Sequence, residues 1–239
     1  MRVAGADGCP SGWLTVAMPI GAPERAEARI VQAERLPALA EVVALDIPIG
    51  LMDGPDDGPR PADKAARRFL SERNIDRIAG VGSRVFPSPT RAHLAILAAG
   101  GTYGDLLGHF RKGQHISKQC FMICPRIIEI DALCRADPDA PLWESHPEIG
   151  FAHRAGRTLP SKHRPEGLRA RQDLLSEAGF DLARLAAALP DGRRHWAPDD
   201  LLDACMLALT GTRMARGTHA GLPNLTDRDS HGLRRVIHF

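Results

Sequence analysis

The fold is decided by Val3-Ala4-Gly5-Ala6-Asp7-Gly8-Cys9-Pro10-Ser11-Gly12-Trp13-Leu14-Thr15-Val16-Ala17-Met18. In this stretch two apolar runs are separated by a cluster of glycine, proline and serine. Such an arrangement predicts a β-hairpin, with strands over 3–7 and 13–18 and a turn between them. A third strand is expected over 28–33, followed by a short helix over 36–42.

A continuous apolar run comes next, Val42-Val43-Ala44-Leu45-Asp46-Ile47, with a single carboxylate near its end. Runs of this kind are typical of parallel strands that helices cover on both faces. The chain is therefore expected to open as β-β-β-α-β, in the α/β class. A later strand is expected over 142–146, ending at Pro147.

The middle of the chain, residues 54–138, alternates Pro/Gly-rich loops with helical segments near 62–72 and 90–99. It is expected to be an insertion and not a second domain. Further helices are expected over 168–178 and 182–189. A last helix should begin at Pro198 and stop at Gly217. A length of 239 residues suits one domain over 1–239.

The composition excludes several classes of protein. The chain holds 31 Lys and Arg against 29 Asp and Glu, so it is neither a polybasic tail protein nor an acidic disordered activator. No run approaches the ~18 apolar residues of a membrane span, and no signal-peptide pattern precedes residue 20. Five cysteines without a C-x-x-C pair indicate reduced thiols. We expect a soluble, cytoplasmic protein without a membrane partner, and a homo-oligomer is left open.

Three carboxylates stand inside a strand or at its apolar end: Asp7, Asp46 and Glu144. Strand propensity and desolvation both disfavour these positions. Because neighbouring strand ends converge on one crevice in an α/β sheet, the three would repel one another unless neutralised. A divalent cation is the obvious neutraliser. Taken singly, an Asx-turn, a turn residue and a solvated strand edge would explain them equally well.

Two further patterns add candidates. Glu144, His146 and Glu148 stand two residues apart, so in an extended segment they would share a face as a metal or general-base cluster. A charged strand edge is the alternative. On the last helix Asp203 is expected on the stripe opposite that of Leu201, as a site residue, a solvated residue or a partner of the helix dipole.

Together the motifs resemble the predicted RNase H-like nucleases grouped as domain-of-unknown-function family 429. The matching blocks span residues 5–204 and read G-x-D-G-C-x-x-G-W from Gly5, D-I-P-I-G-L from Asp46, S-x-V-F-P-x-P-x-R from Ser83, E-x-D from Glu129, E-x-H-P-E from Glu144, S-K from Ser161 and D-x-x-D-A from Asp200. The resemblance implies one RNase H-like domain over 1–239: three antiparallel strands, then parallel strands interleaved with helices.

The resemblance also implies a metal site. In nucleases of this fold, acids of the first strand, the fourth strand and a C-terminal helix gather around metal ions, which assigns Asp7, Asp46 and Asp203 to those places. One of the two motif acids, Glu144 or Glu148, is expected as a further metal ligand, with Glu144 taken first, and both are expected as catalytic acids. Mg²⁺ or Mn²⁺ prefers such oxygen ligands, and two ions ~4 Å apart can promote in-line displacement at phosphorus. His146 is expected to shuttle a proton or to serve as a structural histidine.

Substrate contacts are expected from basic residues that match the motifs: Arg67, Arg91, Lys162 and Arg171. Clustered Lys and Arg give a phosphate-binding surface, although solvated helix faces are also rich in them. Aromatic residues make up only 5% of the chain and do not alternate with basic ones. A broad stacking platform for single strands is therefore not expected. The substrate would be a nucleic acid, a short oligonucleotide or a nucleotide.

Three functions remain open from the sequence. The first is a metal-dependent phosphodiester hydrolase, that is, a nuclease. The second is a nucleotide-binding phosphotransferase or ATPase of the same fold, although only one copy of the domain is visible and no G-x-x-x-x-G-K-[ST] loop occurs. The third is a non-catalytic binding protein that retains the fold.

Overall fold

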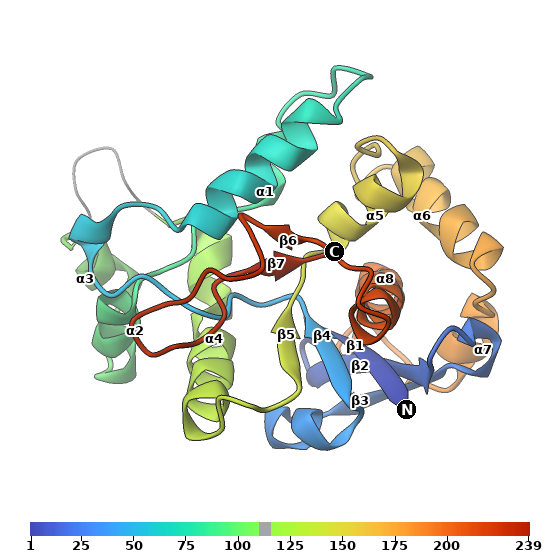
Figure 1. Cartoon of the computed structure of the whole chain (residues 1–239), viewed down its shortest axis with the longest axis horizontal. Helices are drawn as coiled ribbons and strands as arrows, with labels where there is room; N and C mark the ends of the chain where they lie inside the picture. Colours follow the sequence, from blue (N-terminus) through green and yellow to red (C-terminus); the bar gives the residue numbers. More distant parts are fainter. Residues whose placement is uncertain (110–115) are drawn as a thin grey trace.

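A five-stranded mixed sheet forms the centre of the computed structural model, which describes residues 1–109 and 116–239 (Figure 1). The strand order is β3-β2-β1-β4-β5. The first three strands pair antiparallel, whereas β1, β4 and β5 run parallel. This confirms the α/β class. The strands are β1 (Arg2–Cys9), β2 (Gly12–Pro19), β3 (Glu27–Val31), β4 (Val42–Leu45) and β5 (Leu142–Glu144).

The hairpin that opens the chain turns at Pro10 and Ser11, and Gly12 begins its second strand. β1 and β2 pair from Arg2 with Pro19 to Cys9 with Gly12. Gly12 has φ +134°, and a Cβ there would lie 2.5 Å from the carbonyl oxygen of Val31. Only glycine combines this backbone angle with so close an approach of the neighbouring strand.

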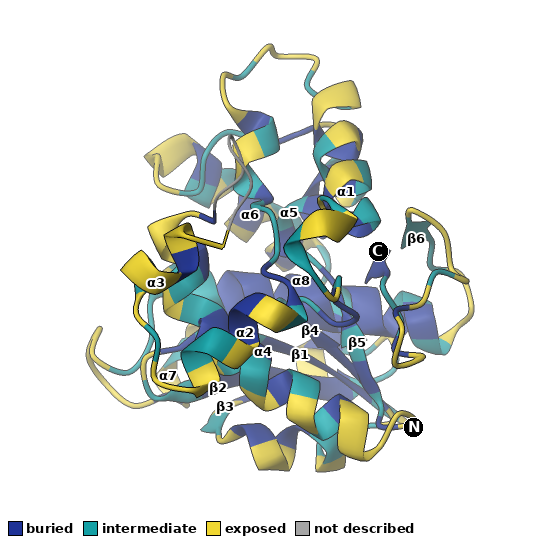
Figure 2. Cartoon of the chain, turned by 90° about the vertical axis from the view of Figure 1, so that its left-hand side faces the viewer, coloured by how far each residue is buried: buried dark blue, intermediate teal, exposed yellow. Residues whose placement is uncertain are grey.

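Helix α8 (Pro198–Ala215) packs directly on β1 and forms the centre of the core (Figure 1). A Cβ on Gly5 would lie 2.1 Å from the carbonyl oxygen of Ala204. The helix is buried at nearly every position from Leu201 to Thr212, as the dark blue ribbon shows (Figure 2). Its hydrophobic residues therefore face protein on all sides instead of forming a single apolar stripe.

Helices cover both faces of the sheet. One core cluster joins α8 to Leu14, Val16, Leu175 and Leu185, and so to the helices that follow β5. These are α5 (Pro147–Ala155), α6 (Pro165–Glu177) and α7 (Leu182–Ala187). A second cluster places Ile127 and Ile130 of α4 (Lys118–Ala136) against Val43 and Leu45 on the opposite face.

The remaining elements lie beside this sandwich. Helix α1 (Pro61–Glu72) packs on α5 and on the short pair β6 (Gly221–Leu222) and β7 (Ile237–His238), through a third cluster that includes Phe69 and Phe239. The other described elements are α2 (Arg91–Ala98), α3 (Tyr103–Leu107) and the 3₁₀ helices Pro23–Arg25, Ala33–Ala38, Pro55–Asp57 and Val81–Arg84.

Several elements differ from the sequence-based expectation. The helix expected over 36–42 is a 3₁₀ helix at Ala33–Ala38 that contains Pro37. The strand expected over 142–146 stops at Glu144, because Pro147 begins a helix. Helix α4 was not expected, since Pro125 lies inside it and normally marks a helix end. The pair β6 and β7 is too short to leave a periodic pattern.

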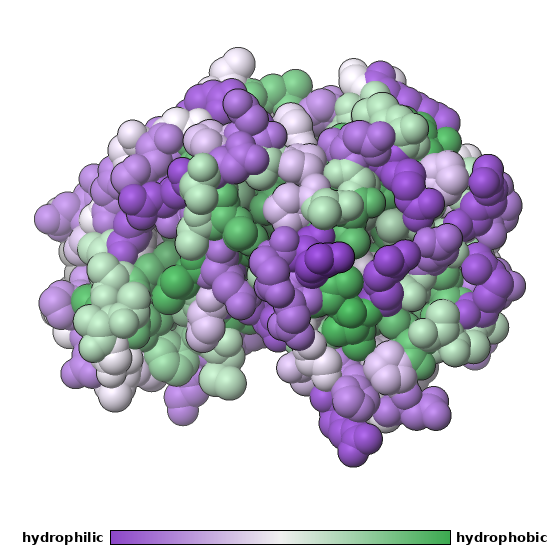
Figure 3. Space-filling model, turned by 90° about the horizontal axis from the view of Figure 1, so that it is seen from below, coloured by the Kyte–Doolittle hydropathy of each residue, from purple (hydrophilic) through white to green (hydrophobic). Residues whose placement is uncertain are grey.

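Within the described residues, no helix has the length and apolar character needed to cross a membrane. All five cysteines are buried and free. On the face seen from below, apolar side chains lie in small groups between hydrophilic ones (Figure 3).

Candidate functional site

Asp7, two residues before the end of β1, and Asp46, directly after β4, lie side by side on neighbouring parallel strands. Ala6 pairs with Leu45, so the next residue of each strand is one of these aspartates. The backbone N–H of Asp46 donates to the carbonyl oxygen of Ala6 at 3.2 Å and extends the pairing to this point. Both residues line a cleft of about 400 Å³ at this edge of the sheet. The strand-end juxtaposition inferred from the sequence is present for this pair.

Asp203 reaches the same cleft from α8. Gly5 and Asp7 are two residues apart on β1 and share a face, and α8 touches that face at Gly5 through Ala204. Asp203, the residue before Ala204, is only 2% exposed. The expectation of a solvated stripe was wrong, because α8 is enclosed on all sides.

The two oxygens of Asp203 are in different environments. Oδ2 accepts a hydrogen bond from Lys162 Nζ at 2.6 Å. Oδ1 is buried and has no hydrogen-bond partner among the described residues. Buried carboxylate oxygens are normally satisfied, so an unpaired one at a cleft wall is a position where a ligand would bind.

Burial raises the pKa values of all three aspartates, and repulsion from neighbouring acids adds to it. Burial raises the pKa of Asp7 well above its usual value, and repulsion from Asp203 and Asp46 adds to this. The pKa of Asp46 is also raised, mainly by burial. Burial raises the pKa of Asp203 to about 6, against the opposite effect of Lys162. The three carboxyl groups therefore do not all ionise together unless a cation binds among them.

Lys162 lies in the segment between α5 and α6. Besides Asp203, its Nζ contacts Asp199 Oδ2 at 3.0 Å. Burial disfavours its charged form, yet Asp203 and Asp7 raise its pKa overall. Lys162 is thus a permanent cation within the carboxylate cluster, where the sequence suggested only a substrate contact.

Glu144 lies on the wall of the cleft but is engaged elsewhere. It is 4% exposed, and the Arg60 guanidinium holds both of its carboxylate oxygens. Oε2 also accepts the backbone N–H of Ile49 at 2.7 Å. Burial raises its pKa to about 7, against the effect of Arg60. With its charge neutralised in this way, Glu144 fixes the loop after Asp46 and is not available as the metal ligand that we expected.

His146 and Glu148 do not share a strand face with Glu144, contrary to the sequence-based expectation. His146 is the N-cap of α5, where its Nδ1 accepts the backbone N–H of Glu148 at 3.2 Å. Glu148 is paired with two guanidinium groups, those of Arg84 at 2.6 Å and Arg171. Burial tends to raise the pKa of Glu148, but Arg171 and Arg84 lower it overall. His146 lines the cleft, whereas the charge of Glu148 is already compensated.

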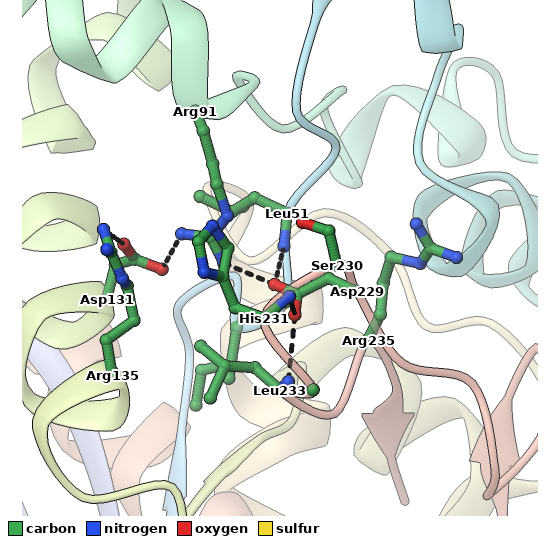
Figure 4. Close-up of polar contacts among 12 residues, drawn as sticks. Leu51, Arg91, Asp131, Arg135, Asp229, Ser230, His231, Leu233 and Arg235 are labelled. Atoms are coloured by element: carbon green, nitrogen blue, oxygen red, sulfur yellow. Dashed lines mark hydrogen bonds and ion pairs between the residues drawn. The ribbon is translucent and has the colours of Figure 1, made fainter.

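Two of the expected substrate-binding arginines are enclosed. Arg171 is 0% exposed and donates from Nη1 to the carbonyl oxygens of Pro160 and Gly167 at 2.9 and 2.7 Å. Arg91 bridges Asp131, at 2.5 Å, and the buried Asp229 (Figure 4). It does not line the cleft. Both serve as internal counterions, Arg171 fully buried and Arg91 12% exposed, and neither is part of the cleft lining.

Arg67 lies beside the cleft in a neighbouring hollow. Its Nε donates to the carbonyl oxygen of Val85 at 2.6 Å. The hollow also contains Phe86 and Ser88, which the cleft shares. Arg67 is therefore next to the carboxylates without touching them.

The roles of several cleft residues could not be inferred from the sequence. Arg60 and Arg84 belong to the basic residues of the inserted segment that were expected to contact substrate, whereas the structure pairs them with Glu144 and Glu148. Arg126 comes from the unexpected helix α4, where it lies over the Trp13 ring at 5.6 Å and donates to Gly12 O at 2.8 Å. Asp200 also lines the cleft, and the sequence could have indicated it, because it is the first acid of the D-x-x-D-A motif that contains Asp203.

The cleft carries a surplus of negative charge. Its described lining includes eight Asp or Glu side chains and four Lys or Arg side chains. Among the described residues, no group of three or more His, Cys, Asp or Glu side chains is placed so that it could hold a metal ion by itself. Mg²⁺ is commonly bound by one or two carboxylates, with water and substrate phosphate completing its shell. The donors present suit that incomplete type of site.

A family model described as protein of unknown function, DUF429, matches residues 5–228. The chain belongs to this family. Neither the curated proteins nor the solved structures to which the sequence was compared include a match. The match to the DUF429 model covers every cleft residue discussed above, from Asp7 to Asp203.

Proposed function

We propose that this DUF429 protein is a metal-dependent phosphodiester hydrolase, with Asp7, Asp46 and Asp203 as the ligands of Mg²⁺ or Mn²⁺. One observation carries the proposal: carboxylates from β1, β4 and α8 meet in one cleft, and Asp203 Oδ1 is buried there without a partner. Burial and repulsion between the acids raise the pKa values of Asp7 and Asp203, so their ionised forms are disfavoured without a cation. Such an arrangement is typical of a site kept for function.

The topology supports an RNase H-like architecture. Three antiparallel strands are followed by parallel strands, in the order β3-β2-β1-β4-β5. The three aspartates occupy the first strand, the end of the fourth strand and the last long helix. These are the places that the resemblance to predicted RNase H-like nucleases assigns to metal-binding acids.

The donor chemistry fits a hard divalent cation. All three candidate ligands are carboxylates. The described lining of the cleft contains no Cys or Met, and its histidines are His146 and His163. When bound, Mg²⁺ or Mn²⁺ would polarise a phosphoryl oxygen and lower the pKa of a coordinated water. Asp7 and Asp203 would then keep their ionised forms, because a cation relieves their mutual repulsion.

The residues of the chain would hold and orient the reacting groups. In hydrolysis the oxygen of water bonds to phosphorus, the P–O bond to the leaving group breaks, and the departing oxygen keeps that electron pair. One proton of water passes to a base and a proton is returned to the departing oxygen. His146 lines the cleft and is suited to carry such a proton.

The substrate that suits this cleft is small. Eight acids against four bases in the described lining repel a long polyanion, so affinity must come from few contacts near the metal. A nucleotide or short oligonucleotide meets this condition better than a long duplex. The five buried free thiols agree with a reducing, cytoplasmic location, which belongs to the same proposal.

The test is hydrolysis of bis(p-nitrophenyl) phosphate and of short DNA and RNA oligonucleotides with Mg²⁺, Mn²⁺ or EDTA. Cleavage with either metal and none with EDTA is expected. Asp7→Asn and Asp203→Asn should each lower kcat by 10²-fold or more, by analogy with other deletions of transition-state stabilisation. Asp173→Asn, an exposed aspartate on α6, is the control. Full activity in both site variants, or in EDTA, would contradict the proposal.

A further inference from the structure

We propose that Lys162 is a built-in second cation of this site, so that the protein holds a single divalent ion where two would otherwise bind. The inference rests on the proposed function. It concerns the number of metal ions and the residue that contacts the phosphate, neither of which the carboxylates alone determine.

The position of the lysine is the first argument. Lys162 Nζ lies 2.6 Å from Asp203 Oδ2 and 3.0 Å from Asp199 Oδ2, which makes it the bridge between two carboxylates of α8. Paired metal ions about 4 Å apart are usually bridged by shared carboxylates. Asp203 has only Oδ1 left for a metal, so it cannot bridge two ions while Lys162 is in place.

The second argument is that a buried network holds this segment in position. Arg84 donates to the carbonyl oxygen of Leu159 at 2.8 Å, and Arg171 donates to that of Pro160 at 2.9 Å. Both guanidinium groups are tied to Glu148. Two residues later the chain reaches Lys162. The three charged residues therefore fix the backbone that leads to the lysine.

Helix α6 constrains the segment from the other side. A Cβ on Gly167 would lie 2.1 Å from the carbonyl oxygen of Ser161, the residue before Lys162. The helix therefore lies in direct contact with the segment. An ammonium group whose backbone is constrained by α6 and by a buried charge network is a built feature of the fold.

The third argument is donor capacity. A lysine ammonium has three N–H donors, and two of them face Asp199 and Asp203. The side chain is 28% exposed and lines the cleft, so the third donor is accessible to a ligand. A non-bridging oxygen of a phosphodiester is an acceptor for this N–H. Lys162 would thus neutralise charge on the phosphate, and it would be a catalytic residue.

The experiment counts bound Mn²⁺ by the electron paramagnetic resonance signal of the free ion during titration of the full chain. One bound ion per chain is expected for the wild type. Lys162→Gln should bind two, because the bridge between Asp199 and Asp203 is open to a second ion. The matched control is Lys64→Gln, an exposed lysine on α1, which should bind one. Thermal unfolding of each variant verifies that it is folded.

The outcomes separate the two proposals. Two ions in the wild type, or one ion in a folded Lys162→Gln variant, would overturn the role of the lysine and leave the hydrolase proposal intact. No bound Mn²⁺ in the wild type would contradict the metal site itself, and with it both proposals. Hydrolysis of bis(p-nitrophenyl) phosphate adds a second readout: when Mn²⁺ is limited to one equivalent per chain, Lys162→Gln should have a kcat about 10²-fold lower than the wild type.

Discussion

A Cβ on Gly5 of β1 would lie 2.1 Å from the carbonyl oxygen of Ala204 on α8, so strand and helix touch through their backbones. This contact sets the distance between Asp7 and Asp203, since each acid is within two residues of it. Gly5→Ala should force the helix outward and lower the free energy of unfolding by about 3 kcal/mol, the upper range for overpacking. Urea unfolding measures this. Gly54→Ala, where the Cβ would make only an ordinary contact at 3.8 Å, should change little.

Removing a carboxylate from the cleft should stabilise the metal-free protein. Burial and the neighbouring acids raise the pKa of Asp7, so ionisation of Asp7 opposes folding above the unfolded value of ~3.9. Asp7→Asn should therefore gain stability over the wild type as pH rises from 4 towards 8. At pH 8 in EDTA we expect a Tm higher by about 2 °C or more, which corresponds to ~1 kcal/mol at this size.

Added Mn²⁺ should reverse that ranking. The wild type gains Tm from the ion, whereas Asp7→Asn gains less because a ligand is missing. The exposed variant Asp173→Asn should follow the wild type in both conditions. An Asp7→Asn protein less stable than the wild type in EDTA would show that the carboxylate is structural.

Protonation of His238 should destabilise the protein in acid. Burial, His219 and Arg234 lower the pKa of His238 to about 3, and the ring is 1% exposed. Between pH 6.5 and 3 the imidazole is protonated in the unfolded state but not in the folded state. The free energy of unfolding therefore decreases as the pH is lowered through this range. Relative to His238→Phe, the wild type should lose about 2 kcal/mol between pH 7 and pH 5.

Urea unfolding at several pH values, with each variant compared with the wild type, isolates this effect from other titrations. His231→Phe changes an exposed histidine and serves as the control. Parallel pH profiles for the wild type and His238→Phe would show that His238 keeps an ordinary pKa.

The buried ion network around Arg60 should be essential for folding. Arg60 is 2% exposed and joins Glu144 to Asp63, whose Oδ1 lies 2.7 Å from its Nη2. Arg60→Leu leaves both carboxylates buried without their cation, and a loss of about 3–5 kcal/mol is expected. Arg68→Leu, at an exposed position of helix α1, should change the free energy of unfolding by less than ~0.5 kcal/mol. Urea unfolding compares the two, and equal losses would contradict the assignment.

The sequence predicted those parts that depend on local pattern. The hairpin, β4 and the strand-end positions of Asp7 and Asp46 follow from apolar runs and turn residues. Burial of Asp203 does not follow, because a helical stripe gives no sign of a second layer on its other side. Nor do the positions of Arg171 and Arg91, since each depends on carboxylates distant in sequence. The sequence pattern predicts substrate contacts for these two arginines, where the fold uses them as internal counterions.

The acidic residues and the lysine of the cleft stand on different kinds of element, which affects how DUF429 proteins can diverge in sequence. The three aspartates stand on β1, at the end of β4 and on α8, which also form the core. Lys162 stands on residues 156–164, a stretch without helix or strand. If the proposed function holds, substitutions in that stretch would alter which phosphate esters are accepted, while the core elements that carry the three aspartates stay unchanged.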